Sequence, residues 1–176
     1  MVAPAQADIS FEVDPAANWI SYVNAFELDG TTWLFGWGDW GTDIASNPAI
    51  FDPPQGPGTL TLGANTRVWT ENETNPDWVD QGTGLATRIL EVNTYYETWD
   101  LNGETVDFSG DVVSNDMVAG YDTYAFIKTL DPGQGWATTQ LVSEPLVGGQ
   151  PFDLSLLVDG NIGDTGLLTQ VGFYVK

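Results

Sequence analysis

Apolar and polar residues alternate with a period of two along most of this chain. Alternation of this kind is typical of β-strands, because successive side chains of a strand point to opposite faces of the sheet. The alternating segments are residues 9–13, 19–28, 59–62, 88–99, 105–113, 121–130, 152–158 and 168–175. Each segment is therefore expected to form one strand.

Glycine, proline, asparagine and aspartate gather between these segments. Examples are "DPPQGPG" at 52–58, "LNGE" at 101–104 and "DPGQG" at 131–135. These residues favour tight turns, and no segment has the 3.6-residue period of an amphipathic helix. The pattern predicts an antiparallel β-sandwich, with a closed barrel as the alternative. We expect one domain over residues 1–176, in which residues 1–7 form a flexible N-terminal extension.

The net charge of the chain narrows the range of partners that it is expected to bind. There are 25 Asp and Glu against 4 Lys and Arg, and the formal net charge is −21. Such a surface repels nucleic acids, anionic lipids and uronate polymers, whereas neutral ligands and calcium ions are not opposed. No apolar run approaches the roughly 18 residues of a membrane helix. We therefore expect no nucleic-acid partner and no membrane insertion.

The start of the chain and its acidity both favour an extracellular location. "VAPAQADIS" after Met1 is typical of residues that follow a removed leader peptide. A strongly acidic surface also favours solubility in saline surroundings. We expect a secreted or cell-surface protein.

Cysteine and histidine are absent. Their absence excludes disulfides and a thiol nucleophile, and it leaves zinc, haem and Ser-His-Asp chemistry poorly supported. A glycosidase needs only two carboxylates, and 25 acidic residues supply a pair without singling one out. The sequence therefore favours a binding protein, with a small glycoside hydrolase as the catalytic alternative.

Aromatic residues are abundant, with 8 Trp, 6 Tyr and 8 Phe. In "TTWLFGWGDWG" at 31–41, strand alternation places Trp33 in the core and leaves Trp40 exposed at a turn. Trp78 and Trp136 lie in polar, glycine-containing connections. Flat rings on such loops are typical of surfaces that stack on sugars. Packing of these rings inside the core is the alternative.

A second candidate surface lies around "NTYYETWD" at 93–100. Alternation places Glu91, Asn93, Tyr95 and Glu97 on one face of a strand. Carboxylates and amides bond to sugar hydroxyls, while a tyrosine ring packs on the C–H face of a sugar. We expect this face to line a sugar-binding groove, and an ordinary solvated face is the alternative.

Three parts of the sequence resemble jelly-roll carbohydrate-binding modules of families four and nine. They are "DISFEVDPAANWI" at the start, "GETVDFSGDVVSNDMVAGYDTYAFIKTLDP" in the middle, and "PFDLSLLVDG" with "TQVGFYV" near the end. The resemblance implies a galactose-binding-like jelly roll that binds glycans without catalysis. Such modules are appended to secreted bacterial glycanases and surface proteins. They often hold a structural calcium ion with the glutamate of the entry strand, which is Glu12 here.

Two stretches offer oxygen ligands for such a calcium ion. Asp14 follows Glu12, and Asp159 and Asp164 lie in "VDGNIGDTG" at 158–166. Aspartates that only bond to the backbone of their own turns are the alternative.

These features predict a module that binds a neutral polysaccharide without altering it. Its expected ligand-binding residues are Trp40, Trp78, Glu91, Asn93, Tyr95, Glu97 and Trp136. A catalytic domain in the same parent chain is a further expected partner. The main rival is an extracellular structural protein, such as a filament or surface layer, in which tryptophan patches form subunit contacts and calcium assists assembly.

Overall fold

The computed structural model describes residues 8–14, 17–39, 49–51, 59–99, 101–160 and 166–176, and these form an all-β sandwich. Helical structure in them is limited to α1 (Arg67–Glu71) and the 3₁₀ turn η3 (Pro132–Gln134). The strands are β1 (Asp8–Phe11), β2 (Ile20–Phe26), β3 (Trp33–Asp39), β4 (Ala49–Phe51), β5 (Leu60–Leu62), β6 (Ile89–Thr98), β7 (Thr105–Asp111), β8 (Thr123–Asp131), β9 (Ala137–Pro145), β10 (Pro151–Leu157) and β11 (Leu168–Val175).

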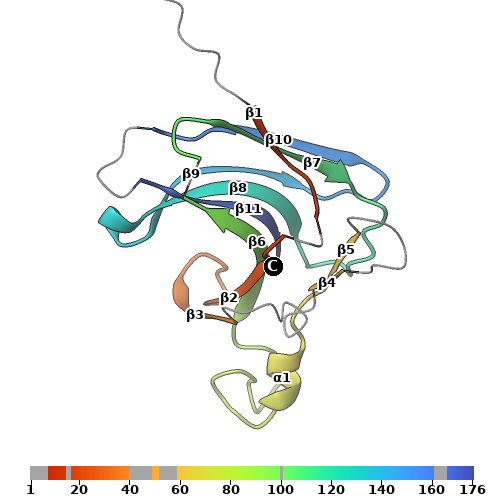
Figure 1. The fold of residues 1–176 in the computed structure, drawn as a ribbon. Coiled ribbons are helices and arrows are strands. Elements are labelled where there is room, and N and C mark those ends of the chain that lie inside the picture. The colour runs from red at the N-terminus through yellow and green to blue at the C-terminus, as the bar shows by residue number, and fades with distance from the viewer. Residues whose placement is uncertain (1–7, 15–16, 40–48, 52–58, 100, 161–165) are drawn as a thin grey trace, which may run out of the picture.

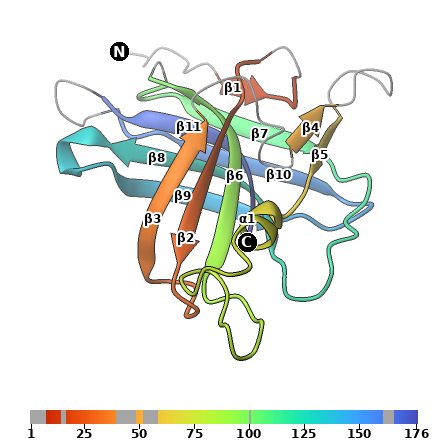
Figure 2. The ribbon, with the colours of Figure 1, turned by 90° about the horizontal axis from the view of Figure 1, so that it is seen from below.

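The larger layer is a six-stranded sheet with the order β3-β2-β6-β11-β8-β9 (Figures 1 and 2). All of its neighbouring strands pair antiparallel. Among the described residues, β3 and β9 each have one hydrogen-bonded neighbour in this sheet. The sheet is therefore open, and the alternative of a closed barrel does not hold.

The smaller layer is a three-stranded sheet with the order β1-β7-β10, which lies over one face of the larger sheet (Figure 1). β10 pairs antiparallel with β7, whereas the short β1 pairs parallel with it. A separate ribbon of β4 and β5 lies beside the two layers.

The main core fills the space between the two layers. The Phe108 ring packs against the rings of Phe152 and Phe173, with centroid separations of 5.0 and 5.2 Å. Burial of each such side chain contributes about 1.5–3 kcal/mol to stability. The buried members of this core are Trp19, Ala49, Leu101, Val106, Phe108, Ala125, Ile127, Phe152, Leu154, Val158, Leu167, Val171 and Phe173.

A second, smaller core lies on the same face of the large sheet, where β2 and β6 extend beyond the three-stranded sheet. It consists of Val23, Ala25, Leu90 and Val92. Trp37, Val68, Trp69 and Trp78 pack against these residues, and two of the four come from α1. The single turn of α1 thus covers apolar surface that would otherwise face water.

The opposite face of the six-stranded sheet is called the outer face below. Both cores lie on the other side of this sheet, and Figure 1 shows the strands bowing so that the outer face is their concave side. The side chains that strand alternation and register place on it include Ile20, Tyr22, Asn24, Phe26, Ile89, Glu91, Asn93, Tyr95, Glu97, Tyr124, Phe126, Lys128, Leu130, Leu168, Gln170 and Tyr174.

Candidate functional site

The outer face brings together aromatic rings and polar side chains from at least four strands. The prediction that Glu91, Asn93, Tyr95 and Glu97 share one face of β6 is confirmed, because β6 pairs with β2 and β11 without a break in register. The alternation predicted within residues 19–28 is also confirmed, because Ile20, Tyr22 and Asn24 of β2 pair with Tyr95, Asn93 and Glu91.

Glu91 is the centre of a hydrogen-bond network on this face. Its Oε1 atom accepts from Asn24 Nδ2 at 3.1 Å and from Asn93 Nδ2 at 3.0 Å. Its Oε2 atom accepts from Lys176 Nζ at 3.3 Å, and this pair is also an ion pair. Both carboxylate oxygens are therefore engaged, and the network fixes the orientation of the amide of Asn24.

Trp33 extends this network to the edge of the sheet. Its indole Nε1–H donates to Asn24 Oδ1 at 3.1 Å, although the side chain as a whole is 57% exposed. A large aromatic ring that is both exposed and held by a hydrogen bond presents a fixed apolar surface to solvent.

The prediction that Trp33 lies in the core is wrong, and a β-bulge explains why. In the pairing of β2 with β3, Phe35 stands opposite Ala25 while Trp33 stands opposite Phe26, so Leu34 is the extra residue. A bulge of this kind reverses the alternation of side chains along the strand. Trp33 therefore lies on the outer face, and Phe35 on the inner one.

Tyr22 lies on the outer face, directly over two glycines of β3. A Cβ atom at Gly36 would fall 2.5 Å from Cε1 of Tyr22, and one at Gly38 would fall 2.6 Å from Cδ2. Only glycine at both positions leaves room for the ring. Sequence analysis missed this contact, and the signal for it was the Gly-Trp-Gly spacing in a strand next to Tyr22.

The middle of the outer face is filled by its own side chains. Tyr95 is 3% exposed and Asn93 is 2% exposed, so the prediction that Tyr95 forms an open wall of a groove is wrong. The reason is that the Lys128 ammonium lies over the rings of Phe126 and Tyr95, 4.7 and 5.8 Å from their centroids. Side chains on the concave side of a bowed sheet converge and shield one another.

The burial of this region changes its acid–base properties. Burial raises the pKa of the Tyr95 phenol, and the charge of Glu97 raises it further. Burial lowers the pKa of the Lys128 amine, although the charges of Glu91 and Glu97 act in the opposite direction. Burial also raises the pKa of the Tyr174 phenol to about 12. At neutral pH both phenols are therefore uncharged and can donate hydrogen bonds.

Glu97 is partly exposed, and its carboxylate is held by a neighbouring strand. Gln170 Nε2 donates to Glu97 Oε2 at 2.9 Å. Glu97 and Glu91 thus both lie on the outer face with fixed orientations, near opposite ends of β6.

Trp78 does not join the other predicted ligand-binding residues. It lies on the inner side, where its ring packs edge-on against Trp37 and Phe35 at 6.1 and 5.9 Å. The guanidinium of Arg88 lies 5.0 Å from the Trp78 ring and 5.1 Å from the Phe35 ring. This cluster covers the smaller core, so the alternative of packing against the core holds for Trp78. Trp40 lies outside the described residues.

Trp136 is exposed, as the sequence predicts. Its side chain is 55% exposed and packs edge to face against Trp99, which is 42% exposed, at 6.1 Å. The φ of Trp136 is 67°, a left-handed conformation that costs a residue with a Cβ atom about 1 kcal/mol or more. The sequence analysis did not single out Trp99, which directly follows β6.

The predicted calcium ligands lie in separate segments after β1 and β10. Glu12 and Asp14 are exposed just after β1, and Asp159 is exposed after β10, with its backbone N–H donating to Gln140 Oε1 at 3.0 Å. Asp164 lies outside the described residues. In the part of the chain that is described, no three Asp or Glu side chains are grouped to hold a metal ion. Calcium binding stays a prediction.

No helix among the described residues has the length and apolar character needed to cross a bilayer. Comparison with protein-family models, curated proteins and solved structures finds no match for this chain. The resemblance to carbohydrate-binding modules therefore stays an expectation from the sequence.

Proposed function

We propose that this protein binds a neutral polysaccharide at the outer face of the six-stranded sheet and does not alter it. The observation that carries this proposal is the fixed, exposed indole of Trp33. It is tied through Asn24 to the Glu91 network, and Asn24 lies two residues along β2 from Tyr22 on the same face. Stacking on a sugar ring needs a flat apolar surface, and its hydroxyls need nearby amides and carboxylates.

The rigidity of this site supports binding. A mobile ring must be immobilised when a ligand binds, and that costs about 0.5–1.5 kcal/mol per side chain. The hydrogen bond of Trp33 and the glycine contacts of Tyr22 already hold these two rings in the folded protein, so the ligand does not have to immobilise them. More of the binding energy then appears as affinity.

The positions of the exposed aromatic residues fit an elongated ligand. Trp33 stands near the start of β6, since it pairs with Phe26, which pairs with Ile89. Trp99 and Trp136 lie beyond the other end of β6. Ten residues of strand separate Ile89 from Trp99, or about 33 Å at about 3.3 Å per residue. A polysaccharide of several sugar units could contact both ends.

The charges on this face favour a neutral polymer over an acidic one. The two lysines on this face, Lys128 and Lys176, lie with Glu91 and Glu97, while the whole chain carries −21. A uronate or sulfated polymer would approach against this field. We propose a secreted or surface setting, in which a linked catalytic domain would be concentrated on the polymer.

Affinity electrophoresis in gels with laminarin, xylan, agarose or cellulose derivatives tests the proposal. At least one glycan should retard the protein. Trp33→Ala and Tyr22→Ala should each weaken binding about tenfold, which corresponds to about 1.4 kcal/mol. Leu157→Ala is the matched control, because Leu157 is also 57% exposed but lies on β10 of the other sheet. The control should bind like the parent protein.

Three other outcomes would contradict the proposal. Absence of retardation on every glycan, together with concentration-dependent assembly, would favour the extracellular structural protein. Release of reducing ends would favour a glycoside hydrolase. Equal binding by Trp33→Ala, Tyr22→Ala and the control would show that the glycan does not bind at this part of the outer face. Repeating the gels with EDTA tests whether calcium is needed.

A further inference from the structure

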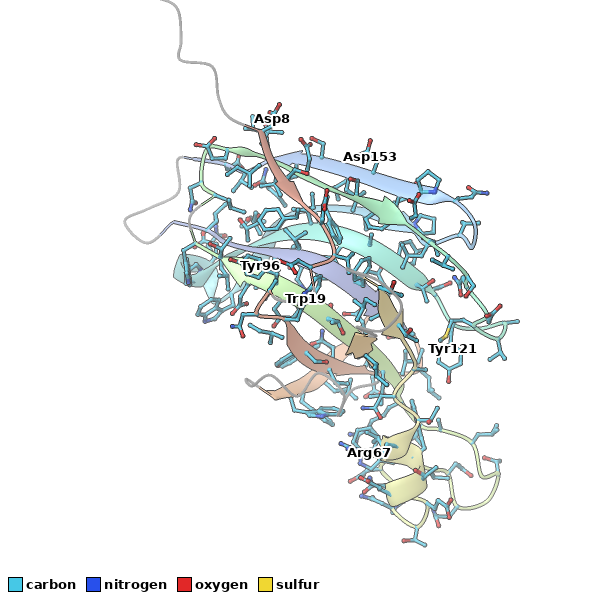
Figure 3. The ribbon with its side chains drawn as sticks, turned by 45° about the vertical axis from the view of Figure 1, so that its right-hand side comes forward. Asp8, Trp19, Arg67, Tyr96, Tyr121 and Asp153 are labelled. Carbon is cyan, nitrogen blue, oxygen red and sulfur yellow. The ribbon has the colours of Figure 1, made fainter. Side chains whose placement is uncertain are left out.

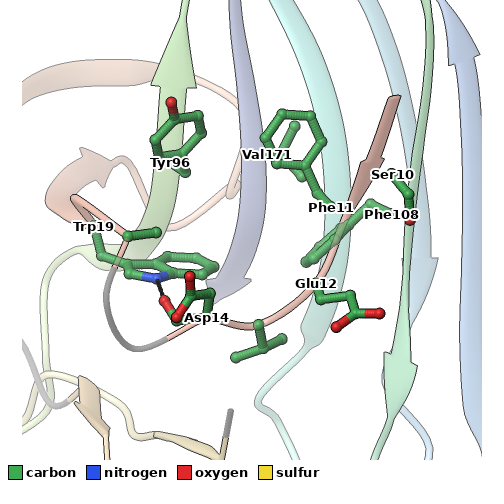
Figure 4. Close-up of a pocket in the computed structure, with 10 residues that line it drawn as sticks. Ser10, Phe11, Glu12, Asp14, Trp19, Tyr96, Phe108 and Val171 are labelled. Atoms are coloured by element: carbon green, nitrogen blue, oxygen red, sulfur yellow. Dashed lines mark hydrogen bonds between the residues drawn. The ribbon is translucent and has the colours of Figure 1, made fainter. Parts of the chain in front are cut away.

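A cavity of about 690 Å³ lies between the two sheets, beneath β1 and the residues that follow it (Figure 4). Its most buried lining residues, Phe108 and Val171, belong to the main core and are 1% and 2% exposed. Besides Phe108, three other aromatic residues line it, namely Phe11, Trp19 and Tyr96. This cavity is separate from the outer face, which is on the far side of the six-stranded sheet.

The aromatic walls of the cavity are held in place by other parts of the fold. Trp19 Nε1–H donates to the backbone oxygen of Asp14 at 2.7 Å, and the Trp19 ring stacks on Phe173 with 13° between the planes. The Phe11 ring packs against Tyr96 with 5.6 Å between centroids. Figure 3 shows Trp19 and Tyr96 close together beneath β1. The rings thus line the cavity without needing a ligand to order them.

The charged residues that line this cavity are acidic. Glu12 and Asp14 are both exposed, and none of the described residues that line the cavity is a lysine or arginine. The chain as a whole carries −21, so its electrostatic potential attracts cations. A ligand for this cavity should therefore combine a positive charge with an apolar surface.

We propose that this cavity binds an organic cation of the quaternary ammonium class. Its methyl groups contact the rings of Phe11, Trp19 and Tyr96, since aromatic faces attract such cations. The carboxylates of Asp14 and Glu12 balance its charge. The volume lies within the range of small-molecule sites. A calcium ion suits the cavity less well, because it needs six to eight oxygen ligands and most of the lining is apolar.

Titration with choline and with its uncharged carbon analogue 3,3-dimethylbutan-1-ol separates charge from apolar fit. Both compounds have nearly the same shape, but only choline is cationic. We expect choline to bind at least about tenfold more tightly in isothermal titration calorimetry. Its binding should weaken as salt is added, because salt screens the carboxylates. In NMR spectra, choline should shift the signals of Trp19 and Tyr96.

Variants test the two parts of the cavity separately. Tyr96→Leu keeps apolar bulk but removes one aromatic face, and Asp14→Asn removes one charge with little change of shape. Each should weaken choline binding several-fold and leave the affinity for the uncharged analogue nearly unchanged. Asp8→Asn is the control, because Asp8 is also an exposed aspartate, at the start of β1, but does not line the cavity. Circular dichroism checks that each variant is folded.

Several results would overturn the inference. Equal affinity for choline and its uncharged analogue would show that the cavity does not select for positive charge. Choline shifts confined to the outer face, or no saturable shifts at all, would show that the cavity does not take a cation. A neutral oligosaccharide that shifts Trp19 and Tyr96 in place of choline would assign the cavity to sugar.

Discussion

Tyr22, Gly36 and Gly38 show how single residues shape the outer face. The two glycines remove the side chains that would otherwise stand beneath the tyrosine ring, so the ring lies against the backbone of β3. Strand interiors usually disfavour glycine because it loses much conformational freedom on folding. In β3, the edge strand that also carries Trp33, glycine instead allows a close contact between the Tyr22 ring and the backbone.

The variant Gly36→Ala tests this contact. Its Cβ atom would fall 2.5 Å from atoms of the Tyr22 ring, so the ring must move. We expect a loss of about 1–3 kcal/mol in the free energy of unfolding, as is usual when a well-packed site is overfilled. Glycan binding should weaken as well. Urea denaturation measures the first effect and affinity electrophoresis the second.

Gly82→Ala is the control for that variant. A Cβ atom there would meet its nearest neighbour, Asp80 Oδ1, at an ordinary 3.4 Å. Its stability and its glycan binding should stay close to those of the parent protein. Gly36→Ala with parental stability and binding would show that Tyr22 does not need the glycines.

The turn between β2 and β3 is the element that presents Trp33. Asp29 Oδ1 accepts from the backbone N–H groups of Thr31 and Thr32 at 2.8 Å each, and Oδ2 accepts from Thr32 Oγ1 at 2.6 Å. The bonds from Thr32, followed by that from Thr31, lower the pKa of the Asp29 carboxyl to about 2. Asp80 forms the same kind of turn with Gly82 and Thr83, and its pKa is lowered too.

The lowered pKa of Asp29 predicts how this turn responds to acid. The folded-state pKa lies below the ordinary value of 3.8, so the carboxylate stabilises the turn at pH values above that value. The stabilisation is lost as the pH falls from about 4 towards 2. Hydrogen exchange of the Thr31 and Thr32 amides should therefore speed up over this range, after correction for the intrinsic rate. Asp29→Asn should remove that pH dependence, and its persistence would contradict the prediction.

Sequence alone predicted most strands but not the face on which each residue lies. Each of the eight alternating segments overlaps a strand, whereas β4 and β9 were missed. β4 has only three residues, and threonine, glutamine and serine blur the alternation of β9. In β2 the small residues Ser21, Val23 and Ala25 point inward and the larger ones outward. A period of two cannot show which face is buried when both carry apolar residues.

The candidate site was predicted in part for the same reason. Residues on one strand, such as Glu91 and Tyr95, follow from alternation, and the exposure of Trp136 follows from its loop. Trp33 could not be predicted, because a bulge depends on how two strands pair. The burial of Tyr95 depends on side chains from neighbouring strands, and alternation within one strand carries no information about them.

At the scale of the whole molecule, charge is the dominant feature. With 25 acidic and 4 basic residues, the folded protein holds many negative charges close together, whereas the unfolded chain can move them apart. Among the described residues only two ion pairs are formed, Arg67 with Glu71 and Lys176 with Glu91. Attractive pairs therefore offset little of this repulsion.

We therefore expect added salt to stabilise the protein. Screening shortens the range of charge repulsion from about 10 Å at 0.1 M to about 3 Å at 1 M. Thermal unfolding in 0.05 and 1 M sodium chloride should show a melting temperature that is higher by a few degrees in the concentrated salt. Sodium perchlorate at equal ionic strength separates screening from salting-out. A melting temperature that stays constant or falls in sodium chloride would contradict this expectation.

The scarcity of basic residues affects how this protein can be labelled or immobilised in a binding experiment. Lys128 and Lys176 are the only lysines of this chain, and both point their amines into the outer face. Reagents that couple proteins to sensor chips or dyes through primary amines would therefore attach at the surface proposed to hold the glycan, or at the N-terminus. Attachment through the plentiful carboxylates of the three-stranded sheet, such as Asp153, would leave that surface open to the polymer.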